Sequence, residues 1–527
     1  MMKSIRIKNL RSLSDTKDME LKPINILVGA NSSGKSTFLR LFPLIKQSLR
    51  KKVNGPILWT GDDDDYVDFG SFKETVNNCS DEKEIKFKFK FDMHIDSKNF
   101  FYYRRNSYKN NFKNTNVNIE FSLSERQDNN FDYISKIIIK IFNYEILLEF
   151  NEEQHVKYLK INDNKYSISE NNGKNRIFIG GEYTLFDISL SNLQEIALNK
   201  MNDIIKKKKV KPLEEFDKNL YNIFGMPYIA VELDSVINYY FFTNIVGLET
   251  KNKEANKKID SDGVRQYIDR IVSNSEFNNL VMMYMTPHIY NCISRYLSQY
   301  FRNVYYIAPV RATAERYYRL RNTAVDEVDC RGKNLPIFLN SLKNTDFENF
   351  QKWTEKNLGF IIDKSLSEGH VSLKIKKSET NNTVNLSDSG FGYSQILPII
   401  TQLWYITLIN IKKELINDTP ITITIEQPEL HLHPALQAKL IDVIVKVMKS
   451  LEGRKNVNFV IETHSKTIID RLGNLIYKKK VKKNDIAIFI FNKDTKNLNT
   501  EIECASFDEK GYLENWPIGF FDPEEVF

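Results

Sequence analysis

Cysteine is scarce in this chain of 527 residues, which has only four: Cys79, Cys292, Cys330 and Cys504. None of them belongs to a C-x-x-C pair, so the sequence indicates neither a zinc ribbon nor a disulfide framework. Long hydrophobic runs are absent as well, because no apolar stretch approaches the roughly 20 residues that a membrane span needs. The first residues also lack the apolar core of a signal peptide. We therefore expect a cytoplasmic protein with free thiols and no membrane partner.

Histidine is also rare, with seven in the whole chain, and the sequence carries no nuclease motif. An HNH site needs clustered histidine and asparagine after a turn, and no such cluster exists. No D-x-D follows an acidic strand, as a topoisomerase-primase nuclease site would require. Charge of one sign is not in large excess either, since 75 Lys and Arg stand against 68 Asp and Glu, a net charge of +7. This balance does not by itself name nucleic acid as a partner, although it permits local basic patches.

Hydrophobic patterns divide the chain into four expected segments: 1–80, 81–190, 191–300 and 301–527. The second is rich in alternating strands, such as 85–91, which indicate antiparallel strands with one solvated face. The third shows apolar residues at helical spacing. In the last, apolar runs alternate with helical patterns, and the runs are 304–308, 421–425, 458–461 and 486–490. We predict an α/β fold, a mixed sheet covered by helices, with a β-rich and a helical insertion.

A glycine-rich loop near the start of the chain has the spacing G-x-x-x-x-G-K-[ST]. It follows a short apolar run, 24–28, which we predict to be a buried strand, and it precedes a helical pattern. Backbone N–H groups and the positive end of the helix dipole would face the phosphates of a nucleotide. The Lys35 ammonium can reach the β- and γ-phosphates, and the Ser36 hydroxyl can bind Mg²⁺. The candidate ATP-binding residues are Gly29, Asn31, Ser32, Ser33, Gly34, Lys35, Ser36 and Thr37.

Three later motifs carry residues that could complete a nucleotide site, as metal ligands or as further phosphate contacts. Glu426 ends the predicted strand 421–425, where a second metal ligand belongs in a parallel sheet. About 35 residues further on, the segment Glu462-Thr463-His464-Ser465 follows another predicted strand. Between the loop and these acids, the segment 386–395 is a turn of small residues before a helical pattern, and it is a second potential phosphate contact.

Together these motifs resemble those of ATP-binding-cassette ATPases, in the branch of the SMC-like and overcoming-lysogenization-defect (OLD) proteins. "GANSSGKST" is similar to their Walker A motif, "EQPELHLHP" to their Walker B motif and D-loop, "LSDSGFGYSQ" to an expanded signature, and "ETHS" to the switch histidine. The resemblance covers about the first 80 residues and roughly 300–527. It implies a head-to-tail homodimer or higher homo-oligomer, with ATP and Mg²⁺ held between the Walker A of one protomer and the signature of the other.

The resemblance also assigns roles to residues. Glu426 and Ser36 would bind the metal, and His464 would sense the γ-phosphate. Ser387 or Ser389 would contact the γ-phosphate across the dimer, and the expanded turn leaves open which serine does so. Two glycines of the same turn, Gly390 and Gly392, would contact the γ-phosphate together with that serine.

The sequence departs from the family pattern at the usual catalytic base, where it has Gln427. An amide orients water but cannot take its proton. Either Glu429 substitutes as the base, or hydrolysis is slow and the ATP-bound state is long-lived. A glutamine loop is also not evident, because no glutamine lies between Gln47 and Gln127.

Two further segments have two interpretations each. The segment 308–319 concentrates arginine and tyrosine, which suit phosphates, bases or a partner surface, and equally a structural salt-bridge cluster. The aromatic tail 511–522 needs burial, either on its own ATPase domain or on a partner.

These features lead us to expect an ATPase that works as a nucleotide-gated dimer. In bacterial relatives of similar size, such as Septu-type ATPases, a separate effector nuclease acts beside the ATPase in antiviral defence. We therefore expect a sensor of phage or foreign nucleic acid that controls such an effector. The alternative is a DNA repair or recombination ATPase acting on DNA ends; a transporter subunit matches the motifs less well.

Overall fold

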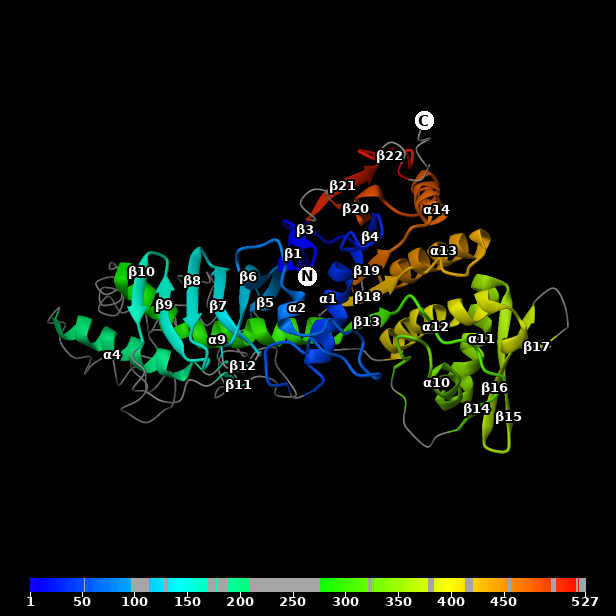
Figure 1. Ribbon diagram of the computed structural model, residues 1–527, viewed down its shortest axis with the longest axis horizontal. Coiled ribbons are helices and arrows are strands. Elements are labelled where there is room, and N and C mark those ends of the chain that lie inside the picture. The colour runs from blue at the N-terminus through cyan, green and yellow to red at the C-terminus, as the bar shows by residue number, and fades with distance from the viewer. Residues whose placement is uncertain are drawn as a thin grey trace, which may run out of the picture. The chain divides into compact units, whose positions relative to one another are not determined.

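The computed structural model describes most of the chain. The described residues are 1–51, 53–95, 113–127, 131–168, 177–178, 187–188, 190–207, 275–320, 325, 327–377, 383–412, 420–452, 456–493, 499–517 and 520. They form two compact units (Figure 1). The first comprises 1–5, 48–57 and 83–298, and the second comprises 6–47, 58–82 and 299–527. Among the described residues, no helix combines the length and the hydrophobicity that a membrane crossing requires.

The first unit is built on an antiparallel sheet with the strand order β10-β9-β8-β7-β6-β5-β1. Its strands are β1 (Met2–Leu10), β5 (Glu84–Ile95), β6 (Lys113–Glu125), β7 (Asp132–Ile141), β8 (Tyr144–Phe150), β9 (Val156–Ile161) and β10 (Asn164–Ser167). Phe87, Phe89 and Phe91 of β5 are buried, as the alternation predicts, because successive side chains point to opposite faces of a strand. The strands β11 (Ile177–Phe178) and β12 (Asp187–Ile188) form a small pair, and the unit also holds the helix α4 (Ser191–Lys207) and most of α9 (Ser275–Arg302). These two helices confirm part of the helical pattern; the rest, at 208–274, lies outside the described residues.

The alternating run 5–10 belongs to an interior strand, although its pattern is equally typical of an edge strand. The strand β1 lies between β5 and β2 (Leu13–Asp15), and it also pairs with β3 (Met19–Glu20). Alternating side chains indicate one solvated face, but they carry no information on whether backbone groups at the two edges find partners.

The second unit contains a mixed sheet, which confirms the predicted α/β class. Among the described residues its strand order is β13-β18-β19-β4-β20-β21-β22. The first five strands are parallel: β13 (Val304–Ile307), β18 (Ile421–Glu426), β19 (Val457–Glu462), β4 (Ile24–Gly29) and β20 (Ile486–Lys493). The last two, β21 (Thr500–Phe507) and β22 (Leu513–Glu514), are antiparallel. All residues of β4, β18 and β19 are buried, as expected for central parallel strands.

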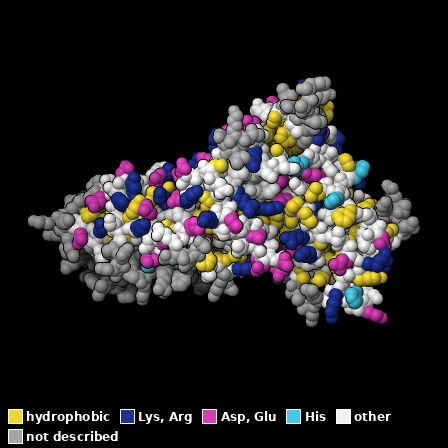
Figure 2. Space-filling model, viewed as in Figure 1, with side chains coloured by type: hydrophobic (Ala, Val, Ile, Leu, Met, Phe, Trp, Pro, Cys, Tyr) yellow, Lys and Arg dark blue, Asp and Glu magenta, His cyan; other side chains and the backbone are white. Residues whose placement is uncertain are grey.

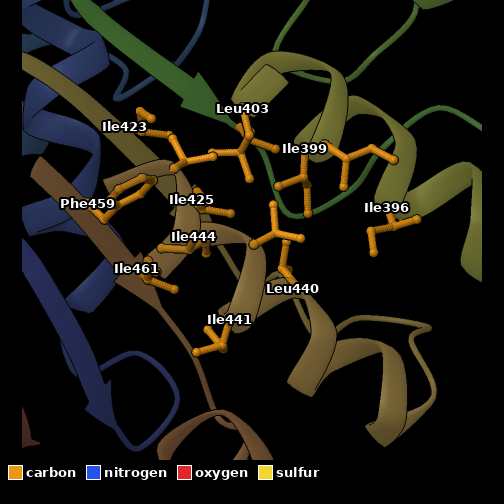
Figure 3. Close-up of a cluster of buried hydrophobic side chains, with 14 of the residues drawn as sticks. Ile396, Ile399, Leu403, Ile423, Ile425, Leu440, Ile441, Ile444, Phe459 and Ile461 are labelled. Atoms are coloured by element: carbon orange, nitrogen blue, oxygen red, sulfur yellow. The ribbon is translucent and has the colours of Figure 1, made fainter. Parts of the chain in front are cut away.

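Two helices of the second unit, α12 (Phe391–Lys412) and α13 (Pro434–Leu451), pack apolar side chains against this sheet. Figure 3 shows Ile399 and Leu403 of α12 beside Ile423 and Ile425 of β18, with Leu440 and Ile444 of α13 completing the cluster. Each fully buried aliphatic side chain of this kind contributes roughly 1.5–3 kcal/mol relative to exposure. The other helices among the described residues of this unit are α1 (Lys35–Ser48), α2 (Phe72–Thr75), α10 (Leu335–Ser341), α11 (Asn344–Leu358), α14 (Lys466–Tyr477) and the short 3₁₀ helices η2 (Leu386–Asp388) and η3 (Lys483–Asp485).

A smaller antiparallel sheet of the second unit has the order β14-β16-β15, with β17 paired to β16. Its strands are β14 (Tyr318–Arg319), β15 (Phe360–Ser367), β16 (His370–Lys377) and β17 (Thr383–Asn385). Two described residues of the aromatic tail pack on their own unit: Trp516 and Phe520 are partly buried against the core, and their rings meet edge to face with centroids 4.8 Å apart. On the face visible in Figure 2, acidic and basic side chains are interspersed, in keeping with the mixed charge of the sequence.

Candidate functional site

The glycine-rich loop connects the buried strand β4 to helix α1, as its pattern predicts. Gly29 has φ +147°, and a Cβ at this position would lie 2.2 Å from the carbonyl oxygen of Phe491. Gly34 has φ +95°, and its Cβ would lie 2.7 Å from Cδ2 of Leu13. The contact at Gly29 is with backbone that cannot move aside, and the positive φ of Gly34 is strained for any other residue, so both positions favour glycine. The backbone can therefore come close to a ligand here.

The polar groups of the loop are arranged around this backbone turn. Lys35 is only 3% exposed, and its ammonium donates hydrogen bonds to the carbonyl oxygens of Gly29 (3.0 Å) and Ala30 (2.7 Å). Burial lowers the pKa of Lys35 below its usual range. The Ser33 hydroxyl is fully buried without a hydrogen-bond partner. Of the other predicted loop residues, Asn31 and Ser32 are exposed, and Thr37 is buried in the first turn of α1.

Two glutamates stand at the carboxyl ends of neighbouring strands. Glu426 ends β18 and Glu462 ends β19, and the two residues pair in register. The strand β19 also pairs with β4, where Glu462 is the partner of Leu27. Glu462 therefore lies on the strand next to the phosphate loop, and Glu426 lies one strand further away.

Glu426, the predicted metal ligand, has both carboxylate oxygens occupied. The Arg40 guanidinium donates to Oε1 at 2.7 Å and to Oε2 at 2.8 Å, and the Tyr306 hydroxyl donates to Oε1 at 2.9 Å. Glu426 is 1% exposed, so this pairing takes place away from solvent. Burial and the Glu426 carboxylate raise the pKa of Tyr306, which keeps its hydroxyl protonated as a donor.

Glu462 is the carboxylate that contacts the phosphate loop. The Ser36 hydroxyl donates to its Oε1 at 2.9 Å, whereas its Oε2 is buried and has no hydrogen-bond partner. Burial raises the pKa of Glu462 to about 7, and the neighbouring Glu426 carboxylate adds to this rise. Hydrogen bonding to Ser36 acts in the opposite direction, since it favours the ionised form.

The predicted catalytic residues form one hydrogen-bonded turn system. Gln427 has φ +41°, and its backbone N–H donates to the carbonyl oxygen of Glu462 at 2.9 Å. The Glu429 carboxylate accepts hydrogen bonds from the Thr463 hydroxyl at 2.9 Å and from the His464 backbone N–H at 2.7 Å. These hydrogen bonds connect the turn at residues 426–429 to the segment 462–465. Partial burial, followed by the Lys35 charge, lowers the pKa of His464.

Arg311 also forms hydrogen bonds with this turn. It is 3% exposed, and its Nη2 donates to the carbonyl oxygens of Glu426 at 3.1 Å and Gln427 at 3.4 Å. Burial lowers the pKa of Arg311 to about 10, and the Glu429 carboxylate opposes that shift. The arginine- and tyrosine-rich segment thus contains a buried residue that contacts the Walker B-like turn.

The signature-like turn lies at the start of α12. Ser387 and Gly390 are exposed, and Gly390 has φ +88° with no atom within 4 Å of a Cβ placed on it. The Ser387 hydroxyl donates to Asn385 Oδ1 at 2.9 Å, and the Ser389 hydroxyl donates to the Leu386 carbonyl oxygen at 2.7 Å. A Cβ on Gly392 would lie 3.1 Å from the carbonyl oxygen of His431. Within the part of the chain that the structure describes, no hydrogen bond joins this turn to residues 29–37.

Comparison with known families agrees with the loop geometry. A family model described as "AAA ATPase domain" matches residues 1–469. The chain belongs to this AAA ATPase family. A second model, DUF3696, described as a protein of unknown function, matches 481–525. None of the curated proteins compared with the chain matches it.

Among solved structures, this ATPase is similar to three SMC head domains. A head bound to the C-terminal winged-helix domain of ScpA is 11% identical, with a TM-score of 0.34, and the match covers 96% of this chain and 98% of that chain. A Pyrococcus furiosus head with an extended coiled coil, bound to the C-terminal domain of ScpA, is 12% identical, with a TM-score of 0.32 and 96% coverage of both. The Thermotoga maritima head is 9% identical, with a TM-score of 0.33 and coverage of 95% and 98%.

Sequence reasoning missed four residues of the site in this ATPase. Arg40, Tyr306 and Thr463 have no role in the motifs as predicted, and Glu462 was noted only as part of "ETHS". A signal for Glu462 existed, because it is an acid at the end of a predicted buried strand, the same argument that singled out Glu426. Arg40 could be found only through the structure, since its partner Glu426 is 386 residues away in the chain.

Together, these residues can accommodate a nucleotide with a divalent cation. The loop offers backbone N–H groups, the Lys35 ammonium and the unpartnered Ser33 hydroxyl to phosphate oxygens. Ser36 and the free oxygen of Glu462 are hard oxygen ligands of the kind that Mg²⁺ prefers. When bound, Mg²⁺ would neutralise negative charge on the β- and γ-phosphates.

Proposed function

We propose that this ATPase is a nucleotide-gated dimer, with each ATP and its Mg²⁺ held between the phosphate loop of one protomer and the signature turn of the other. The observation that carries the proposal is the separation of these two turns. The signature turn is exposed, with Phe391 53% accessible, and it makes no described hydrogen bond to the loop of its own chain. A composite site therefore needs a second copy.

In this proposal, segments 1–80 and 301–527 supply the ATPase, and segments 81–190 and 191–300 are insertions. The residues 29–37 bind the phosphates, and Ser387 or Ser389, with Gly390 and Gly392, contacts the γ-phosphate across the dimer. Gln427 orients water without accepting its proton, so hydrolysis is slow and the ATP-bound dimer is the signalling state.

The same proposal places the protein in antiviral defence. The sequence has no nuclease motif, which supports the proposal that a separate effector protein carries the nuclease activity. Phage or foreign nucleic acid would be the trigger. Purification of the ATPase with its neighbouring gene products separates this role from DNA repair. A nuclease partner supports defence, whereas hydrolysis stimulated by DNA ends supports the repair alternative.

Sedimentation velocity tests the gated dimer. ATP, but not ADP, is expected to shift the wild-type protein from monomer to dimer. Two variants should not respond: Lys35→Ala, which removes the phosphate charge, and Ser387→Arg/Ser389→Arg, which blocks the partner surface. A wild-type mass that ATP does not change would contradict the proposal.

A further inference from the structure

The polar groups next to the phosphate loop form two separate hydrogen-bonded sets, and this separation bears on which carboxylate binds the metal. One set is the closed network of Glu426, Arg40 and Tyr306. The other is the pair formed by Ser36 and Glu462, joined by the hydrogen bond of 2.9 Å. We propose that Glu462, and not Glu426, is the carboxylate that binds Mg²⁺ beside Ser36. This inference rests on the proposed binding of ATP with Mg²⁺.

Glu426 is poorly suited to bind a cation because its oxygens are already engaged. The two hydrogen bonds from Arg40 form a bidentate pair, the strongest arrangement for a carboxylate and a guanidinium. Tyr306 adds a third donor to Oε1. A divalent cation on Glu426 would stand beside the positive charge of Arg40, which would repel it.

Glu462 is suited to the task for the opposite reason. Its side chain is 2% exposed, and Oε2 has no hydrogen-bond partner although it is buried. A buried carboxylate oxygen without a partner is costly, and a bound cation is one of the few groups that compensate for it. The Lys35 ammonium does not bond to this oxygen; the hydrogen bonds that it makes are to the two loop carbonyls.

The position of Glu462 also favours it. A P-loop serine is the expected metal ligand, so a carboxylate that accepts a hydrogen bond from that serine is next to the metal position. Glu462 is carried by β19, which pairs directly with the loop strand β4, whereas Glu426 is carried by the strand beyond. The backbone carbonyl of Glu462 also accepts a hydrogen bond from the Gln427 N–H at 2.9 Å. The proposed metal ligand is therefore bonded directly to the turn that we expect to orient water.

The test measures metal binding and not turnover. Mn²⁺ serves as the probe, and its binding is followed by electron paramagnetic resonance in the presence of adenylyl-imidodiphosphate. The variants are Glu462→Gln, which keeps shape and removes charge, and Glu426→Gln as the matched control on the next strand. We expect Glu462→Gln to weaken Mn²⁺ binding by about tenfold or more and Glu426→Gln to leave it within about threefold. Nucleotide affinity without metal should not fall in Glu462→Gln.

Four results would decide against the inference. It is wrong if Glu462→Gln retains the wild-type Mn²⁺ affinity, or if only Glu426→Gln loses it. If Glu462→Gln does not fold, Glu462→Ala takes its place, and wild-type Mn²⁺ affinity in this folded variant without a carboxylate also overturns the inference. Failure of the wild-type protein to bind adenylyl-imidodiphosphate at all would instead overturn the proposed function, and the inference with it.

Discussion

Arg40 and Glu426 are 386 residues apart in the chain, yet their side chains form a bidentate ion pair with distances of 2.7 and 2.8 Å. The pair connects helix α1, which begins at the phosphate loop, to the end of β18, where the Walker B-like turn begins. Arg40 is 32% exposed at its side chain and Glu426 only 2%. Removing the arginine therefore leaves a buried charge without its main partner.

Arg40→Ala is predicted to destabilise the second unit by about 3 kcal/mol, because breaking a buried ion pair leaves an uncompensated charge. The double variant Arg40→Ala/Glu426→Gln should recover most of the loss. Urea unfolding followed by tryptophan fluorescence is a suitable measurement, since all four tryptophans belong to the second unit.

The exposed pair between Arg316 and Asp388 is the control for this measurement. Its side chains are 58% and 45% exposed, so Arg316→Ala should cost less than about 1 kcal/mol. Equal losses in the two arginine variants would mean that burial of Glu426 does not determine the cost.

Lys35→Ala is predicted to abolish ATP binding without unfolding the chain. The variant removes a phosphate-binding charge and two hydrogen bonds to loop carbonyls, each of which contributes about 1 kcal/mol. Isothermal titration with ATP and circular dichroism are the measurements. Unchanged ATP affinity in the folded variant would mean that the loop does not bind phosphates.

Gln427→Glu is predicted to accelerate single-turnover ATP hydrolysis by about tenfold or more, because a positioned general base typically contributes about 10²–10⁴-fold. Glu429→Gln should change the rate less, since both Glu429 oxygens accept hydrogen bonds from Thr463 and His464 and position that turn. ATP affinity is measured in parallel.

The reverse pattern would identify Glu429 as the base. If neither substitution alters the rate by about threefold, another group activates water, and His464 is the next candidate to replace.

Arg311→Lys is predicted to slow hydrolysis by about tenfold while ATP affinity stays unchanged, because a lysine cannot reproduce the geometry with which Nη2 holds the carbonyls of Glu426 and Gln427. Arg319→Ala, at an exposed position of the same segment, is the control and should behave as wild type. A loss of ATP affinity with normal turnover would show that Arg311 acts on binding and not on the turn.

Much of the ATPase unit could be predicted from local patterns. The runs 304–308, 421–425, 458–461 and 486–490 are strands because fully buried parallel strands are apolar throughout, and the structure confirms them as β13, β18, β19 and β20. The phosphate loop was predictable because glycines, lysine and serine occur together at fixed spacing between a strand and a helix.

The sequence could not predict which residues from separate segments of the chain come into contact. Strand order decides that Glu462 lies beside the loop and Glu426 one strand away, and the order β18-β19-β4 brings together segments from both ends of the chain. The interior position of β1 and the bond from Arg311 to the Gln427 turn have the same origin. Each depends on contacts between separate segments of the chain that no local period encodes.

A mixing experiment tests the composite dimer site most directly. One protomer carries Lys35→Ala and the other carries Ser387→Arg/Ser389→Arg, so that the mixed dimer contains one site built from an intact loop and an intact signature turn. Each parent alone is predicted to have no ATP-dependent activity, and the mixture is predicted to recover that of one site in two. If the mixture recovers no activity while both parents fold and associate, the composite site is contradicted.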